Sequence, residues 1–220
     1  MTRGPLLQIY QRLFEHFGPQ HWWPAETPFE VMIGAILTQN TAWSNVEKAI
    51  ANLRTADTLT PQTLADLPQT QLEQLIRPAG FFRQKASRLK TLARLLETEY
   101  RGEIADLCSG ELEVARARLL AFNGIGPETA DSILLYACTR PTFVVDAYTR
   151  RLFSRLGLLE EDASYTEIRA QFMSGLPGEV ALFNEYHALI VAHCKRYCRK
   201  RRPDCAACPL CTGCPAAMTI

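Results

Sequence analysis

The glycine pair Gly124 and Gly126 constrains the fold of this chain more than any other feature of the sequence. An amphipathic segment ends at Phe122, just before the pair, and Pro127, which suits the first turn of a helix, follows it directly. Because glycine allows backbone angles that a Cβ would forbid, the pair predicts a tight hairpin between two helices. Free N–H groups at such a hairpin, together with the dipole of the second helix, favour an anion. The segment is therefore predicted to bind a phosphate group.

The residues after the hairpin make this prediction more specific. A short apolar run, Phe143-Val144-Val145, leads to Asp146 at the start of another helix. Helix, hairpin, helix, apolar run and aspartate in this order resemble the helix-hairpin-helix DNA glycosylases of the endonuclease III superfamily, and the similarity extends over nearly the whole chain. The resemblance implies that Asp146 is catalytic. It also implies that double-stranded DNA with damaged bases is the partner, bound at the hairpin by Gly124, Ile125, Gly126 and Thr129.

A glycosylase extrudes a nucleotide from the base stack and breaks the bond between C1′ and the base nitrogen. Positive charge develops on the sugar, and a nearby carboxylate stabilises that charge and orients or deprotonates the attacking water. Asp146 suits this role if it is ionised, which free helix N–H groups favour and burial opposes. The alternative for Asp146 is a plain helix N-cap.

Glu128 departs from the family pattern, because endonuclease III itself carries a lysine at this position. In bifunctional relatives the lysine attacks C1′ and forms a Schiff base that leads to strand cleavage. A carboxylate cannot form an imine, so Glu128 predicts water as the nucleophile and a monofunctional enzyme without lyase activity. The alternative is an exposed glutamate of the first helical turn, which the helix dipole favours.

Two further segments match DNA-inserting residues of the family. The polar turn Thr38-Gln39-Asn40-Thr41 interrupts an apolar stretch, and Gln39 matches a glutamine that enters the gap left by a flipped nucleotide. Phe81 precedes a long helix, where it either packs at the helix start or intercalates as a wedge opposite the flipped base.

Three tryptophans are candidates for a base-binding pocket. The alternative for adjacent tryptophans in a linker is to seal the join between two lobes. Together with the polar turn and Glu128, they resemble the 3-methyladenine DNA glycosylase III branch, in which aromatic residues stack on the extruded base. Bases alkylated at N3 or N7 of a purine are cationic, so they need cation–π partners and a nearby negative charge. The tryptophans are Trp22, Trp23 and Trp43.

Four cysteines near the C-terminus follow the spacing C-x6-C-x2-C-x5-C. A zinc ribbon normally has two C-x2-C knuckles, and only one is present. The spacing resembles that of the thiolate ligands of the [4Fe–4S] cluster in endonuclease III, which implies an architectural cluster here. The four are Cys198, Cys205, Cys208 and Cys214.

The remaining cysteines are expected to have other roles. Cys211 is not expected to be a ligand. Cys108, Cys138 and Cys194 are predicted to be small core residues, and the cytoplasmic location expected for the chain argues against a disulfide framework.

Composition says little about a partner, but the distribution of charge is informative. The 220 residues have a formal net charge of +1, 47% are hydrophobic and 21% are charged. No apolar run reaches the length of about 20 residues that spans a bilayer. With no secretory apolar core at the N-terminus, a cytoplasmic, nucleoid-associated monomer is expected. Four cations lie between two of the cysteines, and a rigid loop there would bind DNA phosphates: Arg199, Lys200, Arg201 and Arg202.

Helical periodicity and the scarcity of period-two alternation predict an all-α fold. The family resemblance implies two lobes. Residues 27–140 are expected to form a six-helix barrel with the helix-hairpin-helix at 112–138. Residues 1–26 and 141–220 are expected to form a discontinuous helical lobe that holds the cluster. DNA is expected to bind across the cleft between the lobes, with Asp146 and Glu128 at its mouth.

Three functions fit these patterns. The first is a monofunctional glycosylase for alkylated purines of the 3-methyladenine and 7-methylguanine type. The second is another specificity on the same scaffold, such as oxidised pyrimidines, with weak or no lyase activity. The third is a non-catalytic iron–sulfur DNA-binding protein, which the presence of Asp146, Gln39 and the hairpin disfavours.

Overall fold

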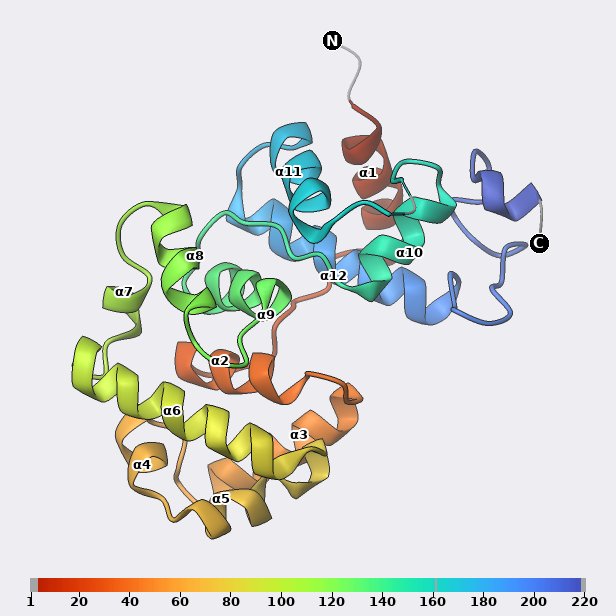
Figure 1. Ribbon diagram of the computed structural model, residues 1–220. Helices are drawn as coiled ribbons and strands as arrows, with labels where there is room; N and C mark the ends of the chain where they lie inside the picture. The colour runs from red at the N-terminus through yellow and green to blue at the C-terminus, as the bar shows by residue number, and fades with distance from the viewer. Residues whose placement is uncertain (1–3, 161, 219–220) are drawn as a thin grey trace. The chain divides into compact units, whose positions relative to one another are not determined.

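The computed structural model describes residues 4–160 and 162–218, and every regular element in these ranges is a helix (Figure 1). The prediction of an all-α fold is therefore confirmed. The chain forms two compact units. The central unit is Trp23–Arg140, and the terminal unit joins Met1–Trp22 to Pro141–Ile220. The chain thus passes from one unit to the other between Trp22 and Trp23, before the predicted boundary at residue 27.

The central unit is built around the helix α2 (Pro28–Leu37). All of its residues from Phe29 to Leu37 are buried, as expected for a helix that is apolar nearly all round, and the exception, Glu30, pairs with Arg54. Thr27 caps its N-terminus by accepting a hydrogen bond from the Glu30 N–H. The elements of this unit are α2 (Pro28–Leu37), α3 (Trp43–Thr55), α4 (Pro61–Asp66), α5 (Gln69–Leu75), η1 (Arg77–Ala79), α6 (Phe82–Tyr100), α7 (Ile104–Leu107), α8 (Leu112–Leu120), α9 (Pro127–Ser132) and the π-helical turn η2 (Ile133–Ala137).

A buried lysine fixes two loops of the central unit. Lys85 of α6 is 1% exposed, and its ammonium donates to the carbonyls of Leu37 and Ala79, each at 2.9 Å. Burial, together with the neighbouring charge of Arg88, lowers the pKa of Lys85 to about 8. The two acceptors lie just before the polar turn at Gln39 and just before Phe81, so one side chain anchors both loops.

The terminal unit has an aromatic core. Phe143 stacks on Phe172 with ring centroids 4.0 Å apart, and Phe183 meets Phe143 edge-on. Tyr186 is fully buried and donates its hydroxyl to the carbonyl of Leu6 at 2.7 Å, which ties the first and last long helices of this unit together. Its elements are α1 (Pro5–Phe17), α10 (Ala147–Arg155), α11 (Tyr165–Gly175), α12 (Val180–Arg196) and η3 (Pro215–Met218).

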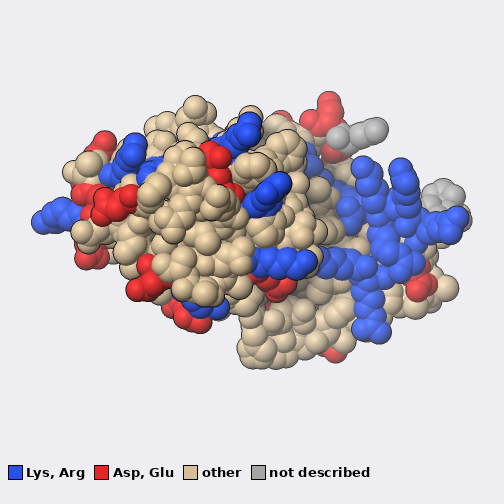
Figure 2. Space-filling view, turned by 90° about the horizontal axis from the view of Figure 1, so that it is seen from below, with Lys and Arg blue, Asp and Glu red and all other residues tan. Residues whose placement is uncertain are grey.

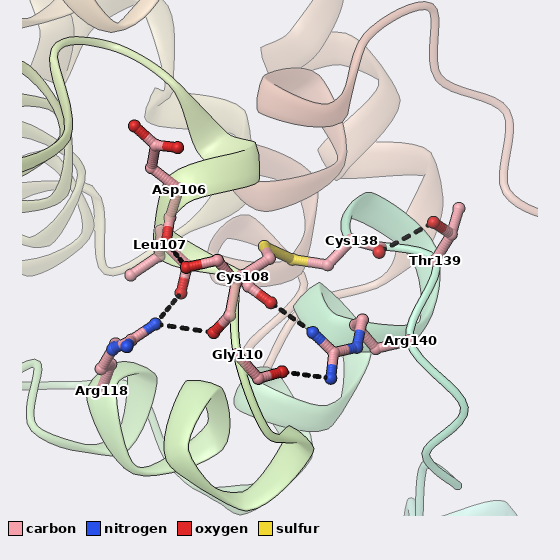
Figure 3. The surroundings of a disulfide bond; sticks show 9 residues. Asp106, Leu107, Cys108, Gly110, Arg118, Cys138, Thr139 and Arg140 are labelled. Atoms are coloured by element: carbon pink, nitrogen blue, oxygen red, sulfur yellow. Dashed lines mark hydrogen bonds between the residues drawn. A yellow bond between two sulfur atoms is a disulfide. The ribbon is translucent and has the colours of Figure 1, made fainter.

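The prediction for one cysteine pair is wrong. Cys108 and Cys138 form a disulfide, with Cα atoms 5.8 Å apart, which is within the ordinary range for such a bond (Figure 3). Cys108 is buried as predicted, but the spacing of 30 residues gave no sign that the fold brings the pair together. Two arginines hold the same loop: Arg140 donates to the carbonyls of Cys108 and Gly110, and Arg118 donates to that of Ser109.

No helix among the described residues is long and apolar enough to cross a membrane.

Candidate functional site

The hairpin has the predicted position between α8 and α9, but only one of its glycines adopts a left-handed conformation. Gly124 has φ +90°, whereas Gly126 has φ −90° and ψ 178°, which any residue can adopt. A Cβ on Gly124 would lie 2.2 Å from Arg88 Nε, and a Cβ on Gly126 would meet nothing within 4 Å. Gly124 is therefore required both by its backbone angle and by the close approach of Arg88.

The hairpin is attached to the central core on its inner side. Ile125 is 6% exposed and its side chain belongs to the core, so that side chain is not available to a ligand. The Ile125 N–H donates to the carbonyl of Phe122 at 3.1 Å. Behind the hairpin, Arg116 of α8 makes a bidentate ion pair with the fully buried Asp131 of α9, with Nε 3.0 Å from Oδ1 and Nη2 3.1 Å from Oδ2. This pair joins the two helices on either side of the hairpin.

Gln39 makes contact with the hairpin. Its Nε2 donates to the carbonyl of Gly124 at 3.0 Å and to Thr129 Oγ1 at 2.9 Å. Its Oε1 accepts from Arg88 Nη1 at 2.6 Å. The structure thus brings together three residues that the sequence analysis identified as candidates, together with one arginine that it did not identify. The three are Gln39, Gly124 and Thr129, and the arginine is Arg88.

Glu128 and Phe81 both lie at the protein surface. Glu128 is exposed in the first turn of α9, where the helix dipole favours a carboxylate. Phe81 is 65% exposed and has φ 45° as the N-cap of α6. A side chain that is mostly exposed contributes little to core packing, which favours the wedge over helix-start packing as the role of Phe81.

Two of the three tryptophans pair with each other. The rings of Trp23 and Trp43 meet edge-to-face at 5.1 Å, and Trp23 also lies 5.1 Å from Tyr136. The Trp43 indole N–H donates to Glu47 Oε1 at 2.8 Å. Trp23, Trp43 and Glu47 line part of a cavity of about 140 Å³ in the central unit. Trp22 belongs to the terminal unit, where the ammonium of Lys195 lies 5.9 Å from its ring centroid.

Asp146 is the N-cap of α10, and its two carboxylate oxygens have different partners. Oδ1 accepts from the Thr149 N–H at 2.7 Å and from the Thr149 hydroxyl at 3.0 Å. Oδ2 lies 3.4 Å from Nε2 of His187, a histidine of α12 whose side chain is 7% exposed. Burial by itself raises the pKa of Asp146, but His187 and the two Thr149 hydrogen bonds outweigh it and lower that pKa below its ordinary value. Asp146 is therefore held as a carboxylate at neutral pH.

The four predicted ligand cysteines line one small apolar cavity of the terminal unit, and Cys211 lies on its wall as well. The chain runs through this segment in successive turns, in which each N–H of Cys208, Cys211 and Cys214 bonds to the carbonyl three residues earlier. The side chains have not closed to metal-binding geometry, since no group of three potential ligands converges within the described residues. Thiols around an apolar cavity form a donor set that suits an iron–sulfur cluster.

Arginines of α10 hold the cysteine segment. Arg155 Nη1 lies 3.2 Å from Cys198 Sγ, and Arg151 Nε donates to the Cys198 carbonyl at 2.8 Å. A hydrogen bond from the Cys194 thiol, together with the charge of Arg155, lowers the pKa of Cys198 below that of an ordinary thiol.

The four cations after Cys198 are exposed, but they do not act alike. Arg199 donates to the carbonyls of Arg196 and Arg202, so its guanidinium closes the loop on itself. Lys200, Arg201 and Arg202 extend from this closed loop. Figure 2 shows Lys and Arg side chains gathered at the end of the molecule that Figure 1 assigns to the C-terminal segment.

Sequence reasoning missed two contributors to the site. Nothing in the spacing of His187 identifies Asp146 as its neighbour, and Arg88 is one of several cations in the sequence of α6. The start of α11, in contrast, has a local signal, because Ser164 and Glu167 form its capping box.

The chain is similar to known DNA repair proteins. Residues 33–178 match the model of the HhH-GPD superfamily base excision DNA repair proteins. A protein of Methanocaldococcus jannaschii, which carries the provisional name of a DNA repair glycosylase, is 48% identical over 212 residues, 96% of this chain and 93% of the relative.

Two solved structures are similar over most of the chain. A non-covalent complex of endonuclease III with DNA has a TM-score of 0.85 at 25% identity and covers 100% of this chain and 98% of that chain. The 3-methyladenine DNA glycosylase of H. pylori bound to 1,N6-ethenoadenine has a TM-score of 0.75 at 30% identity. The match covers 86% of this chain and 97% of that chain. With its hairpin, its capped aspartate and these relatives, the chain belongs to the HhH-GPD superfamily of base excision DNA repair proteins.

Proposed function

We propose that this base excision repair DNA glycosylase releases alkylated purines by hydrolysis and leaves an uncleaved abasic site. The observation that carries the proposal is the Asp146 carboxylate, which Thr149 and His187 keep ionised in a nearly buried position. A fixed negative charge of this kind stabilises a sugar cation without needing to reorganise.

In the proposed reaction, the bond between C1′ and the base nitrogen breaks, and its electron pair leaves with the base. The sugar gains oxocarbenium character, which Asp146 Oδ2 stabilises. Water attacks C1′ and loses a proton to Asp146 or to solvent. His187, which faces the same oxygen, keeps the carboxylate charged before the attack.

Glu128 supports the monofunctional part of the proposal. An amine at this position would form a Schiff base with C1′, and a carboxylate does not. Glu128 is exposed on the first turn of α9, next to the hairpin, and would supply the negative charge that a cationic alkylated base needs nearby.

The aromatic residues support alkylated purines as substrates. A purine methylated at N3 or N7 carries a positive charge, so it binds the face of an indole by a cation–π interaction and is already a good leaving group. Trp23 and Trp43 form one aromatic corner in the central unit, which would supply the indole face. The similarity to the H. pylori 3-methyladenine glycosylase agrees with this choice.

DNA is proposed to bind along the hairpin and the basic loop. The hairpin backbone would contact one phosphate, and Lys200, Arg201 and Arg202 others. The exposed Phe81 would act as the wedge beside the flipped base, as apolar side chains do when they open a base step. Gln39 would enter the gap that the base leaves.

A [4Fe–4S] cluster would be held by Cys198, Cys205, Cys208 and Cys214. The cluster would supply four iron–thiolate bonds that crosslink a short segment with little apolar surface. Within this segment Arg155 and Arg199 already hold the backbone carbonyls in place, and the cluster ligands would fix the rest.

The experiment is a panel of duplexes, each with one defined lesion, incubated with the purified protein with and without hot alkali. We expect base release from 3-methyladenine or 7-methylguanine duplexes, strand breaks only after alkali, and no covalent adduct after borohydride treatment. Efficient trapping by borohydride would contradict the monofunctional part. Base release from duplexes with oxidised pyrimidines alone would contradict alkylated purines as the substrate class and support oxidised pyrimidines instead.

A further inference from the structure

Gln39 is fully engaged inside the central unit. Its amide nitrogen has two hydrogens, and both are used, one on the Gly124 carbonyl and one on Thr129 Oγ1. Its amide oxygen accepts the short bond from Arg88. Because both of its N–H donors are bonded to hairpin residues, the Gln39 side chain has a structural role in the protein without DNA.

Arg88 occupies a place that only a glycine hairpin leaves open. Its Nε, Cδ and Cζ atoms would lie 2.2, 2.5 and 2.8 Å from a Cβ on Gly124. The guanidinium therefore rests directly against the hairpin backbone while it donates to Gln39. Because one partner is charged, this hydrogen bond is stronger than a neutral one.

The other end of this connection is rigid. Arg88 follows Lys85 on α6 by three residues, so both side chains leave the same face of the helix. Lys85 binds the carbonyl of Leu37 and Arg88 binds the side chain of Gln39, which attaches the polar turn to α6 at two points. The hairpin is thus connected through Gln39 and Arg88 to α6, a helix with one face in the core.

The charge of Arg88 has not been neutralised. Among residues 4–160 and 162–218, no carboxylate forms an ion pair with it. A positive charge against the hairpin adds to the field that favours a phosphate at its N–H groups.

We propose that Gln39 and Arg88 form a clamp that holds the hairpin in its phosphate-binding shape, so that both are positioning residues for binding any duplex, damaged or not. The inference rests on the proposed binding of a DNA phosphate by the hairpin. It assigns Gln39 a role that a residue used only to fill the gap of a flipped base would not have. Undamaged DNA separates the two roles, because it contains no such gap.

The test is a double-mutant cycle on the affinity for an undamaged duplex, which needs no base release and is therefore independent of the lesion specificity. We expect Gln39→Met and Arg88→Met each to weaken binding by roughly three- to tenfold, the range for one hydrogen bond. The double variant is expected to bind no more weakly than the weaker-binding single variant, since both substitutions break the same clamp. Arg94→Met, on an exposed part of α6, is the matched control and should change affinity by less than about twofold.

Two outcomes would overturn the clamp. One is additive losses in the double variant, which would make Arg88 an independent phosphate ligand. The other is unchanged affinity for undamaged duplex with a loss only on an abasic duplex, which would leave Gln39 as a gap-filling residue alone. If Arg88→Met does not fold, the cycle is run with Thr129→Val, which removes the hydroxyl acceptor of the Gln39 amide at nearly constant volume. Unchanged binding by that variant contradicts the clamp as well.

Discussion

The hairpin and the cysteine segment are both proposed to bind DNA phosphates, yet they are built in opposite ways. The hairpin rests on an apolar core, with Ile125 and Ala130 buried beneath it and a buried ion pair behind it. After Cys198, Leu210 is the single buried residue among those described. The backbone of that segment is held by arginines that donate to carbonyl groups. The folded core thus shapes one proposed phosphate site, whereas the other would depend on the iron–thiolate bonds of the proposed cluster.

The largest expected effect separates chemistry from DNA binding. Asp146→Asn should lower the rate of base release by roughly 10²-fold or more, because the amide carries no charge to stabilise the sugar cation. Its affinity for undamaged duplex should stay within a few-fold of the original. Gly124→Ala should instead weaken the affinity for undamaged duplex and leave the rate of base release at saturating enzyme nearly unchanged. The reason is that a Cβ there collides with Arg88 and that the residue has φ +90°. Single-turnover base release and titration with undamaged duplex measure the two effects, and Gly126→Ala, at an open position, is the matched control.

The next effect tests the cysteine segment directly. Cys205→Ser should remove a cluster ligand, unfold the segment and weaken DNA binding, with a shallower dependence of affinity on salt because phosphate contacts are lost. Cys211→Ser should keep about four irons per chain, as expected for a [4Fe–4S] cluster. Iron content, visible absorption and the salt dependence of affinity are the measurements. Stoichiometric zinc in colourless, anaerobically prepared protein would refute the cluster.

A smaller effect is expected at the aromatic corner of the central unit. Trp43→Ala should cost about 1–3 kcal/mol in base release, the range for one base–aromatic stack. Affinity for undamaged duplex should change less, because no extruded base is present to stack. The rate of release at saturating enzyme and the affinity for undamaged duplex give the two values. An equal loss in both would show that Trp43 supports the fold rather than the base.

The smallest effect is a change in pH dependence. In the proposed mechanism, base release depends on the ionised form of Asp146, whose pKa is lowered, so activity should fall only when the pH drops through that low pKa. His187→Gln removes a group that lowers this pKa, so the acid limb of the pH–rate profile should move to higher pH. By the same reasoning, stability contributed by the carboxylate above its unfolded pKa should be lost at a higher pH in the variant. An acid limb that does not move would show that His187 only packs against Asp146, and His21→Gln, at an exposed histidine, is the control.

The sequence predicts the elements of this protein better than their partners. The helix start predicted at Pro127 is confirmed, and Pro28 and Pro61 are likewise the first residues of α2 and α4. The meeting of Asp146 with His187 depends on how α10 and α12 pack, which no local pattern encodes. The contact between Gln39 and Arg88 depends in the same way on α6 and the polar turn.

The disulfide shows a different limit of sequence reasoning. The expected cytoplasmic location argues against disulfides in general, because they are rare in that compartment. It gives no information about this particular pair of cysteines. The distance between Cys108 and Cys138 follows from the path of α8, the hairpin and α9. That path becomes visible only once the helices are packed.

The same disulfide turns the helix-hairpin-helix into a closed ring. Cys108 precedes α8 and Cys138 follows η2, so the bond closes a loop of about 30 residues that contains both helices and the hairpin. A protease cut at any single point within this ring would leave the two fragments joined until a reductant is added. On a denaturing gel, the nicked protein would therefore migrate as one chain when oxidised and as two when reduced.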